Sequence, residues 1–173
     1  TNEPGSEPLI VYEQLTLADF QALQNEMYAI GKQANKFIVA VTGVKSNTDW
    51  FNNAYESKGQ GSGIIIANSG QELLILTERK VIAGASSVYV IFVNDTSVEA
   101  SNKKYDGNTG ITVLSVPVDE IDNDTKNLIS VAVLGNSLAI TQGTLALAVG
   151  SPLGTNYSIL TGNITSSAYS IST

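Results

Sequence analysis

The segment LILTERKVIAG, residues 74–84, begins as a strand and ends as a turn. Its first residues are apolar and favour β-structure, whereas Ala83 and Gly84 are small residues typical of a turn. Such a frame presents one polar side chain where the strand ends, and here that side chain belongs to Lys80. The segment therefore predicts an exposed lysine on a turn at a strand end.

Short β-rich runs continue on both sides of this segment from Phe37 onward. Eight of them are separated by turn residues, at 37–44, 62–70, 72–79, 88–96, 111–117, 129–137, 144–152 and 157–166. Strands at this spacing predict an all-β barrel or sandwich. The polar, acidic residues 118–128 lie between the fifth and sixth runs, and we expect them to connect two β subdomains, with one helical turn.

The polar segment 45–60 predicts a long loop around Trp50 and Tyr55. Aromatic side chains on a loop either hold it against its own barrel or form a contact site. Both interpretations remain open for this segment.

The N-terminal region predicts a polar leader followed by a helix. Residues 1–8 are polar and contain two prolines, and Thr16 with Asp19 resembles a capping box. Apolar residues recur at helical spacing at Leu17, Phe20, Leu23, Met27 and Ile30. This stripe either packs against the following domain or forms a self-association face in an oligomer. Gly31 weakens the helix near its end.

Composition excludes several classes of function. The net charge is −7 with only nine basic residues, so a nucleic-acid-binding face is not expected. The chain has no cysteine and therefore no disulfide or thiolate chemistry. It also has no histidine, which removes the usual general base and the commonest metal ligand. No run of eighteen apolar residues, the length of a membrane-spanning helix, occurs.

Neither a metal nor a cofactor is expected. The acidic residues Asp119, Glu120, Asp122 and Asp124 lack the glycine turn and the distal glutamate of a calcium-binding loop, so a solvated connector is the better interpretation. The GQGSG run at residues 59–63 has no following helix or lysine to hold a phosphate.

Four segments in order resemble the HtrA/DegP group of bacterial trypsin-like serine proteases. GQGSGIII (59–66) resembles the glycine-rich second strand, and LILTERKVIAGA (74–85) the strand and turn of the catalytic histidine. DGNTGITVLSV (106–116) resembles the strand of the catalytic aspartate, and residues 134–166 resemble the opening of the second barrel. The resemblance implies a trypsin-like double β-barrel preceded by an N-terminal α-helix, with the second barrel incomplete in this chain. The implied regions are a leader and helix (1–36), a first barrel (37–117), a connector (118–128) and half of a second barrel (129–173).

By this resemblance, Lys80 occupies the position of the catalytic histidine and Gly110 that of the aspartate. The family's nucleophile belongs to a Gly-Asn-Ser-Gly-Gly segment, which does not occur before Thr173. The triad needs a base, an orienting carboxylate and an oxyanion site, and none of these roles is filled. We therefore expect Lys80 and Gly110 to mark a degenerate, non-catalytic site.

The alternative is a serine endopeptidase whose nucleophile lies in a missing C-terminal segment, with Lys80 as a non-standard base. A lysine can act as such a base only when burial lowers its pKa by roughly three units from ~10.4, which costs about 4 kcal/mol. Because Glu78 and Arg79 flank Lys80, an exposed lysine is the favoured interpretation.

The resemblance thus implies a pseudoprotease that binds a protein or peptide ligand outside the cytoplasmic membrane, with an anchor upstream of residue 1. Half a barrel leaves strand edges and an apolar face uncovered. We expect a C-terminal fragment or a second copy to complete it; alternatively, the first barrel and the N-terminal helix cover that face.

Overall fold

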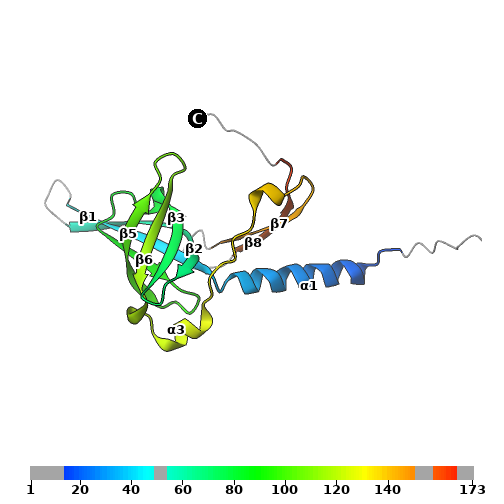
Figure 1. Cartoon of the computed structure of the whole chain (residues 1–173), viewed down its shortest axis with the longest axis horizontal. Coiled ribbons are helices and arrows are strands. Elements are labelled where there is room, and N and C mark those ends of the chain that lie inside the picture. Colours follow the sequence, from blue (N-terminus) through cyan, green and yellow to red (C-terminus); the bar gives the residue numbers. More distant parts are fainter. Residues whose placement is uncertain (1–13, 49–53, 151–157, 167–173) are drawn as a thin grey trace, which may run out of the picture.

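A computed structural model describes residues 14–48, 54–150 and 158–166, and six antiparallel strands form a closed barrel within them (Figure 1). The barrel strands are β1 (Ile38–Thr48), β2 (Ala54–Asn68), β3 (Glu72–Glu78), β4 (Ser87–Ile91), β5 (Ser97–Tyr105) and β6 (Ile111–Pro117). Their order around the barrel is β1-β2-β3-β6-β5-β4, and β1 also pairs with β4 to close it. The expected mostly-β fold with a first barrel is confirmed.

The barrel closes around a single apolar core because its strands alternate between buried and half-exposed side chains. In β3, for example, Leu73, Ile75 and Thr77 are buried and the residues between them are not. The core contains Val39, Val41, Ile65, Leu73, Ile75, Val81, Ile82, Val88, Val90, Phe92, Val98, Ala100, Leu114, Val116 and Ile121. Strand periodicity of two therefore decides which residues fill the barrel.

Two expectations for the first barrel are wrong. The predicted runs omit strand β5, because only Val98 and Ala100 among its residues are buried and the rest are exposed. Residues 45–60 are not a long loop: β1 and β2 pair from Ile38↔Ile64 out to Thr48↔Ala54, so this segment is mostly a hairpin. Trp50 and the side chain of Tyr55 lie outside the described residues, so their role remains a prediction.

The connector contains two short helical segments, where one helical turn was expected. It contains a 3-10 turn, η1 (Val118–Glu120), and helix α3 (Asn123–Leu128). The Asp122 side chain caps α3 by accepting a hydrogen bond from the Thr125 amide at 2.7 Å. Asp122 of the acidic run thus serves as a helix cap, and the described residues include no group of three or more acidic residues that could hold a metal ion.

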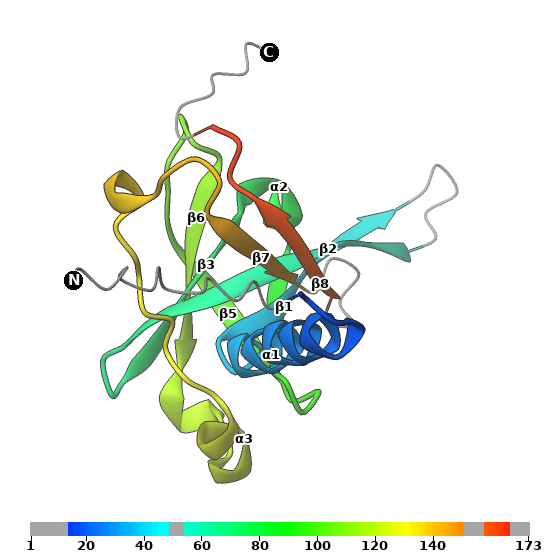
Figure 2. The same cartoon turned by 90° about the vertical axis from the view of Figure 1, so that its right-hand side faces the viewer.

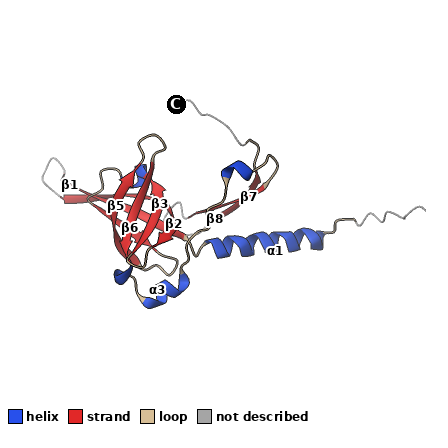
Figure 3. Cartoon of the chain, in the orientation of Figure 1, coloured by secondary structure: helices blue, strands red, loops and turns tan. Residues whose placement is uncertain are grey.

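The predicted strand at residues 129–137 does not form. This segment makes single backbone hydrogen bonds to two different elements, Ser130 N to Lys36 O at 2.9 Å and Ala132 N to Ile65 O at 2.8 Å. With no continuous partner strand among the described residues, it crosses the barrel end as extended chain and reaches the 3-10 turn η2 (Ser137–Ala139). The second sheet in the described residues therefore has two strands, β7 (Leu145–Gly150) and β8 (Ser158–Asn163), separate from the barrel (Figure 3).

Helix α1 (Leu17–Ala34) extends away from the barrel, beside the β7–β8 hairpin (Figures 1 and 2). Its capping box is confirmed, since the Asp19 amide donates to Thr16 Oγ1 at 3.2 Å and the Thr16 amide donates to Asp19 Oδ2 at 2.8 Å. Among the described residues, no helix is long and apolar enough to cross a bilayer.

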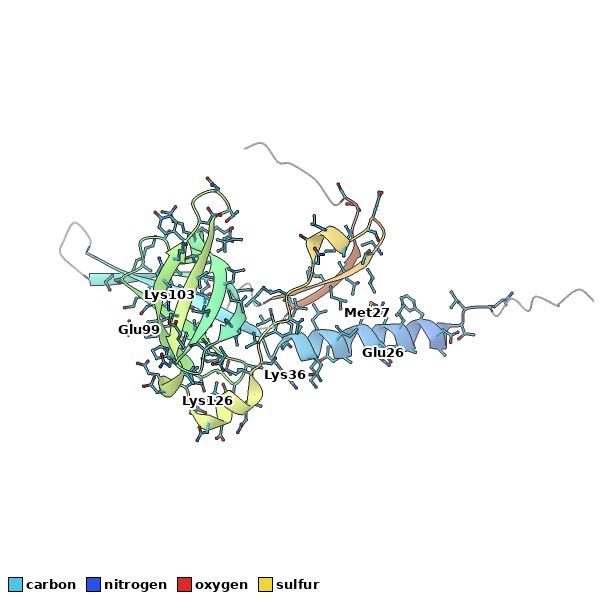
Figure 4. The ribbon with its side chains drawn as sticks, viewed as in Figure 1. Glu26, Met27, Lys36, Glu99, Lys103 and Lys126 are labelled. Atoms are coloured by element: carbon cyan, nitrogen blue, oxygen red, sulfur yellow. The ribbon has the colours of Figure 1, made fainter. Side chains whose placement is uncertain are left out.

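The apolar stripe of α1 is mostly exposed in the single chain, so it packs against the following domain only in part. Within the stripe only Met27 is buried, on the side facing the hairpin, whereas Phe20 is 58% exposed (Figure 4). Gly31 is also buried, and a Cβ there would lie 2.4 Å from Ile159 Cδ1. The glycine therefore permits close contact between α1 and β8, which outweighs its cost in helix propensity.

Candidate functional site

Lys80 lies in the short helical turn α2 (Arg79–Ile82), which begins directly after β3. The turn is anchored by its two apolar residues, since Val81 and Ile82 are both buried in the barrel core. Arg79 and Lys80 point away from the core and are exposed. The strand end thus presents its charged residues to solvent while the next two residues hold the turn in place.

Three glycines on the neighbouring strands make room for this turn. A Cβ at Gly43 or Gly59 would lie 2.6 Å or 2.4 Å from the Val81 carbonyl oxygen, and a Cβ at Gly61 would lie 2.5 Å from Val81 Cγ2. Gly59 and Gly61 are two residues apart on β2, so they face the same side of the sheet. The turn that carries Lys80 therefore packs directly against the glycine-rich strand.

The structure places Gly110 beside this turn. Gly110 has a φ of +71°, and its carbonyl oxygen accepts a hydrogen bond from the Arg79 amide at 2.8 Å. Both residues line an open cleft of about 420 Å³ together with Glu78, Lys80 and Ala83. The two residues expected at triad positions are therefore neighbours at one rim of the barrel.

The loop that presents Gly110 is organised by Asp106. Its carboxylate accepts hydrogen bonds from the Asn108 amide at 3.0 Å and the Thr109 hydroxyl at 2.8 Å, and its carbonyl oxygen accepts one from the Gly110 amide at 3.1 Å. The bond from the Asn108 backbone, followed by that from Thr109, lowers the pKa of the Asp106 carboxyl. The charged carboxylate therefore stabilises the loop.

Acid is expected to loosen this loop before it unfolds the barrel. The folded-state pKa of Asp106 lies below its unfolded value, so the loop's stabilisation is fully present above about pH 4 and is lost as the pH falls through the folded-state pKa. Amide hydrogen exchange at Asn108 and Gly110, followed against pH, measures the change. Asp106→Asn should remove this pH response, and amides that remain protected throughout in the unaltered chain would contradict the assignment.

The charges at the rim are paired locally. Lys80 Nζ lies 2.8 Å from Glu78 Oε1, with side chains that are 77% and 55% exposed. The Arg79 guanidinium lies 4.5 Å from the centre of the Tyr105 ring, which holds it over β5. In the described part of the rim, Lys80 is thus paired with Glu78 and Arg79 lies over an aromatic ring.

A second hollow extends from Lys80 across β2. It measures about 360 Å³ and is lined by Gln60, Gly61 and Ser62 on one side and by Glu78, Lys80 and Val81 on the other. The end of β7 approaches the same place, since a Cβ at Gly150 would lie 3.0 Å from Ser62 Oγ. The rim of the first barrel therefore faces the second sheet across this hollow.

The sequence did not reveal the contact between Arg79 and Tyr105. These residues are 26 positions apart, and the strand order β3-β6-β5, which the sequence does not reveal, places the end of β3 two strands away from Tyr105 on β5. The packing of Val81 against Gly59 and Gly61, in contrast, left a signal in the sequence. The glycines of GQGSG alternate, so they lie on one face of the strand.

Comparisons with known proteins identify the family of this fold. The Trypsin-like peptidase domain model matches residues 61–171. Two curated relatives are named Serine protease Do-like HtrA: one from Lactococcus lactis subsp. cremoris is 32% identical over 118 residues, covering 68% of this chain and 27% of the relative. The other, from Lactobacillus helveticus, is 33% identical over 124 residues, covering 70% and 28%. This chain thus spans about a quarter of the length of these relatives.

Solved structures show the same fold. The structure of the HtrA-type protease AlgW with decapeptide has a TM-score of 0.62 and 22% identity, covering 80% of this chain and 45% of that chain. The closed six-stranded barrel and the second antiparallel sheet of this chain are the arrangement of a trypsin-like fold. The chain belongs to the trypsin-like peptidase domain family, and its barrel has the fold of the HtrA group.

Proposed function

We propose that this protein is a catalytically inactive HtrA-like homologue that uses the trypsin-like scaffold to bind a protein or peptide. The observation that carries the proposal is the pair at the rim, where exposed Lys80 and Gly110 stand at the positions that the resemblance assigns to the catalytic histidine and aspartate. The complete absence of histidine from the 173 residues supports it further, since no other imidazole of this chain can replace the base.

Binding of a peptide does not require the triad. A peptide that adds a strand to a sheet edge is held by backbone hydrogen bonds, which are independent of the residues that perform catalysis. One structural neighbour, the HtrA-type protease AlgW, was solved with a decapeptide. In this chain, we place the peptide in the hollow between Ser62 and Lys80, which β7 approaches.

Treatment with a serine-directed fluorophosphonate and with casein tests the proposed inactivity. The chain, and any longer natural product that contains it, should show neither a labelled serine nor casein fragments, because the base and its carboxylate are missing. An active HtrA relative provides the positive control. A labelled serine in the natural product would contradict the proposal.

Restoring the triad residues in this chain should not restore activity. Lys80→His supplies an imidazole without an orienting carboxylate, and Lys80→His with Gly110→Asp still lacks a serine in an oxyanion site. Turnover of casein by the double variant would reveal a nucleophile elsewhere in residues 1–173.

The second candidate is an endopeptidase with Lys80 as the base, since lysine can activate a serine in other proteins. A lysine base needs a desolvated site, yet the Lys80 side chain is 77% exposed and its ammonium contacts the Glu78 carboxylate. The geometry therefore favours the binding module. The fluorophosphonate experiment separates the two candidates.

The cellular location of the protein is also part of the proposal. One relative, from Hahella chejuensis, is named Probable periplasmic serine endoprotease DegP-like and is 28% identical over 116 residues. By this relationship we place the present protein outside the cytoplasmic membrane, anchored to it. Protease added to intact host cells should degrade it, and protection from that protease would contradict the location.

We also propose that strands from a C-terminal fragment or a second copy complete the sheet formed by β7 and β8. Leu145 and Leu160 on this hairpin are 49% and 70% exposed, and α1 covers only part of it. Intact mass and sedimentation of the purified protein test the proposal. A folded monomer with no associated peptide would favour the alternative of a stable half-barrel.

A further inference from the structure

Arg79, at the barrel rim that carries Lys80, is a cation without a carboxylate partner among the described residues. The ion pairs in that part of the chain join Lys80 to Glu78 and Lys103 to Glu72, and neither includes Arg79. An arginine side chain is always charged and carries five N–H donors in a planar fork. Its guanidinium is therefore able to bind an acid that the chain itself does not supply there.

The carboxylates nearest to Arg79 in the fold are engaged elsewhere. Glu78 lies 2.8 Å from the Lys80 ammonium, and Asp106 accepts two hydrogen bonds from within its own loop. Each acid is thus satisfied by its own turn or loop. A carboxylate that pairs with Arg79 would come from a bound molecule.

Two contacts fix Arg79 in position before any ligand binds. Its amide donates to the Gly110 carbonyl oxygen at 2.8 Å, and its guanidinium lies over the Tyr105 ring, 4.5 Å from the ring centre. This contact with the ring leaves N–H groups of the guanidinium free to donate. Tyr105 is 55% exposed, so a ligand can reach the pair from solvent. A guanidinium held in this way loses little freedom when a carboxylate binds it through two parallel hydrogen bonds.

The open cleft that Arg79 lines adjoins the hollow in which we place the peptide. Glu78 and Lys80 line both the cleft of about 420 Å³ and the hollow across β2. A peptide strand in the hollow can therefore continue past Lys80 and direct a side chain toward Arg79. Two cations and a single carboxylate line the cleft, together with Ala83 and Gly110. The excess of positive charge there favours an acidic side chain.

We propose that the peptide bound at this rim carries an aspartate or glutamate side chain, which pairs with Arg79 in the cleft. The inference rests on the proposed peptide binding and adds the class of peptide. Lys80 contributes as well, because its exposed ion pair with Glu78 is weak and can exchange partners. The net charge of the chain is −7, so acidic peptides are not attracted to the molecule in general. The preference comes from this local group of charges.

Titration of the ¹⁵N-labelled full chain with two end-blocked peptides tests the proposal. One peptide is Thr-Val-Glu-Val-Thr-Glu-Val, and the other has glutamine at both glutamate positions, so the two differ in side-chain charge alone. The blocked ends remove the terminal carboxylate as a second source of binding. The acidic peptide should bind about tenfold more tightly, with saturable shifts at the amides of Arg79, Lys80 and Gly110.

The outcomes separate this inference from the function on which it rests. Equal affinities of the two peptides at the rim would overturn the acidic class and leave peptide binding intact. If neither peptide shifts the rim amides at millimolar concentration, both the inference and the proposed function fail.

Variants test whether Arg79 is the group that selects the acid. Arg79→Gln should weaken binding of the acidic peptide about tenfold and leave the neutral peptide unaffected. Arg79→Lys keeps the charge without the planar fork, so it should recover only part of this loss. Thermal unfolding checks that both variants fold, as expected because the hydrogen bond to Gly110 comes from the Arg79 backbone.

Lys32→Gln is the matched control, because it removes the same charge from an exposed position on α1. It should change neither affinity. Equal losses in Lys32→Gln and Arg79→Gln would show that net charge alone acts, and would overturn the assignment to Arg79. Unchanged affinity of Arg79→Gln for the acidic peptide would overturn it too.

Discussion

Gly59→Ala is expected to lower the free energy of unfolding by about 2–3 kcal/mol and to displace the turn that carries Lys80. The new Cβ would lie 2.4 Å from the Val81 carbonyl oxygen, a backbone atom that cannot move without shifting α2. Because Val81 is part of the barrel core, the turn has no room to retreat inward. Urea unfolding, together with amide shifts of residues 79–82, measures both effects.

Gly107→Ala is the matched control for this substitution. A Cβ at Gly107 would meet no atom within 4 Å, so the same chemical change should leave stability nearly unaltered. Equal stability losses in the two variants would show that lost chain flexibility, and not the contact with Val81, explains the effect at Gly59.

Phe92→Ala is expected to destabilise the barrel by about 3–5 kcal/mol. Phe92 is 1% exposed, belongs to the core cluster, and starts the turn in which its carbonyl oxygen accepts from the Asp95 amide at 2.9 Å. Truncation leaves a cavity where β4 ends, and the closed sheet can collapse into it only partly. Thermal unfolding followed by circular dichroism gives the loss of stability.

Phe20→Ala on α1 provides the comparison for the core variant. The Phe20 side chain is 58% exposed in the single chain, so the same truncation should cost less than about 1 kcal/mol. A large loss at Phe20 would instead show that the α1 stripe is covered in solution, as the self-association interpretation requires.

The stability of the turn that carries Lys80 has a simple physical basis. Val81 and Ile82 hold α2 in the core, and the glycines of β1 and β2 fit around it, so the turn is kept by packing whether or not residue 80 is catalytic. Replacement of an exposed side chain at residue 80 disturbs none of these contacts. The scaffold can therefore persist whichever side chain stands at residue 80.

Much of the barrel could be predicted from the sequence because the signal is local. The β-rich runs at 72–79 and 111–117, the capping box of Thr16 and Asp19, and the order of the four family-like segments are all legible without coordinates. The failures have physical causes as well. Strand β5 is polar because most of its side chains face solvent, and residues 129–137 are apolar yet extended because no described strand lies alongside to pair with them.

The sequence by itself determined that no histidine or cysteine chemistry is available, that a lysine follows the third strand, and that glycines recur on one face of the second. These are properties of composition and of the two-residue period of a strand, and they need no knowledge of the fold. The tertiary structure alone decided that Gly110 accepts a hydrogen bond from Arg79, that Gly31 meets Ile159, and that Arg79 lies over the Tyr105 ring. Each of these contacts forms because folding brings together segments that are distant in the chain. Which residues become neighbours in space, and which are buried, cannot be read from the order of residues alone.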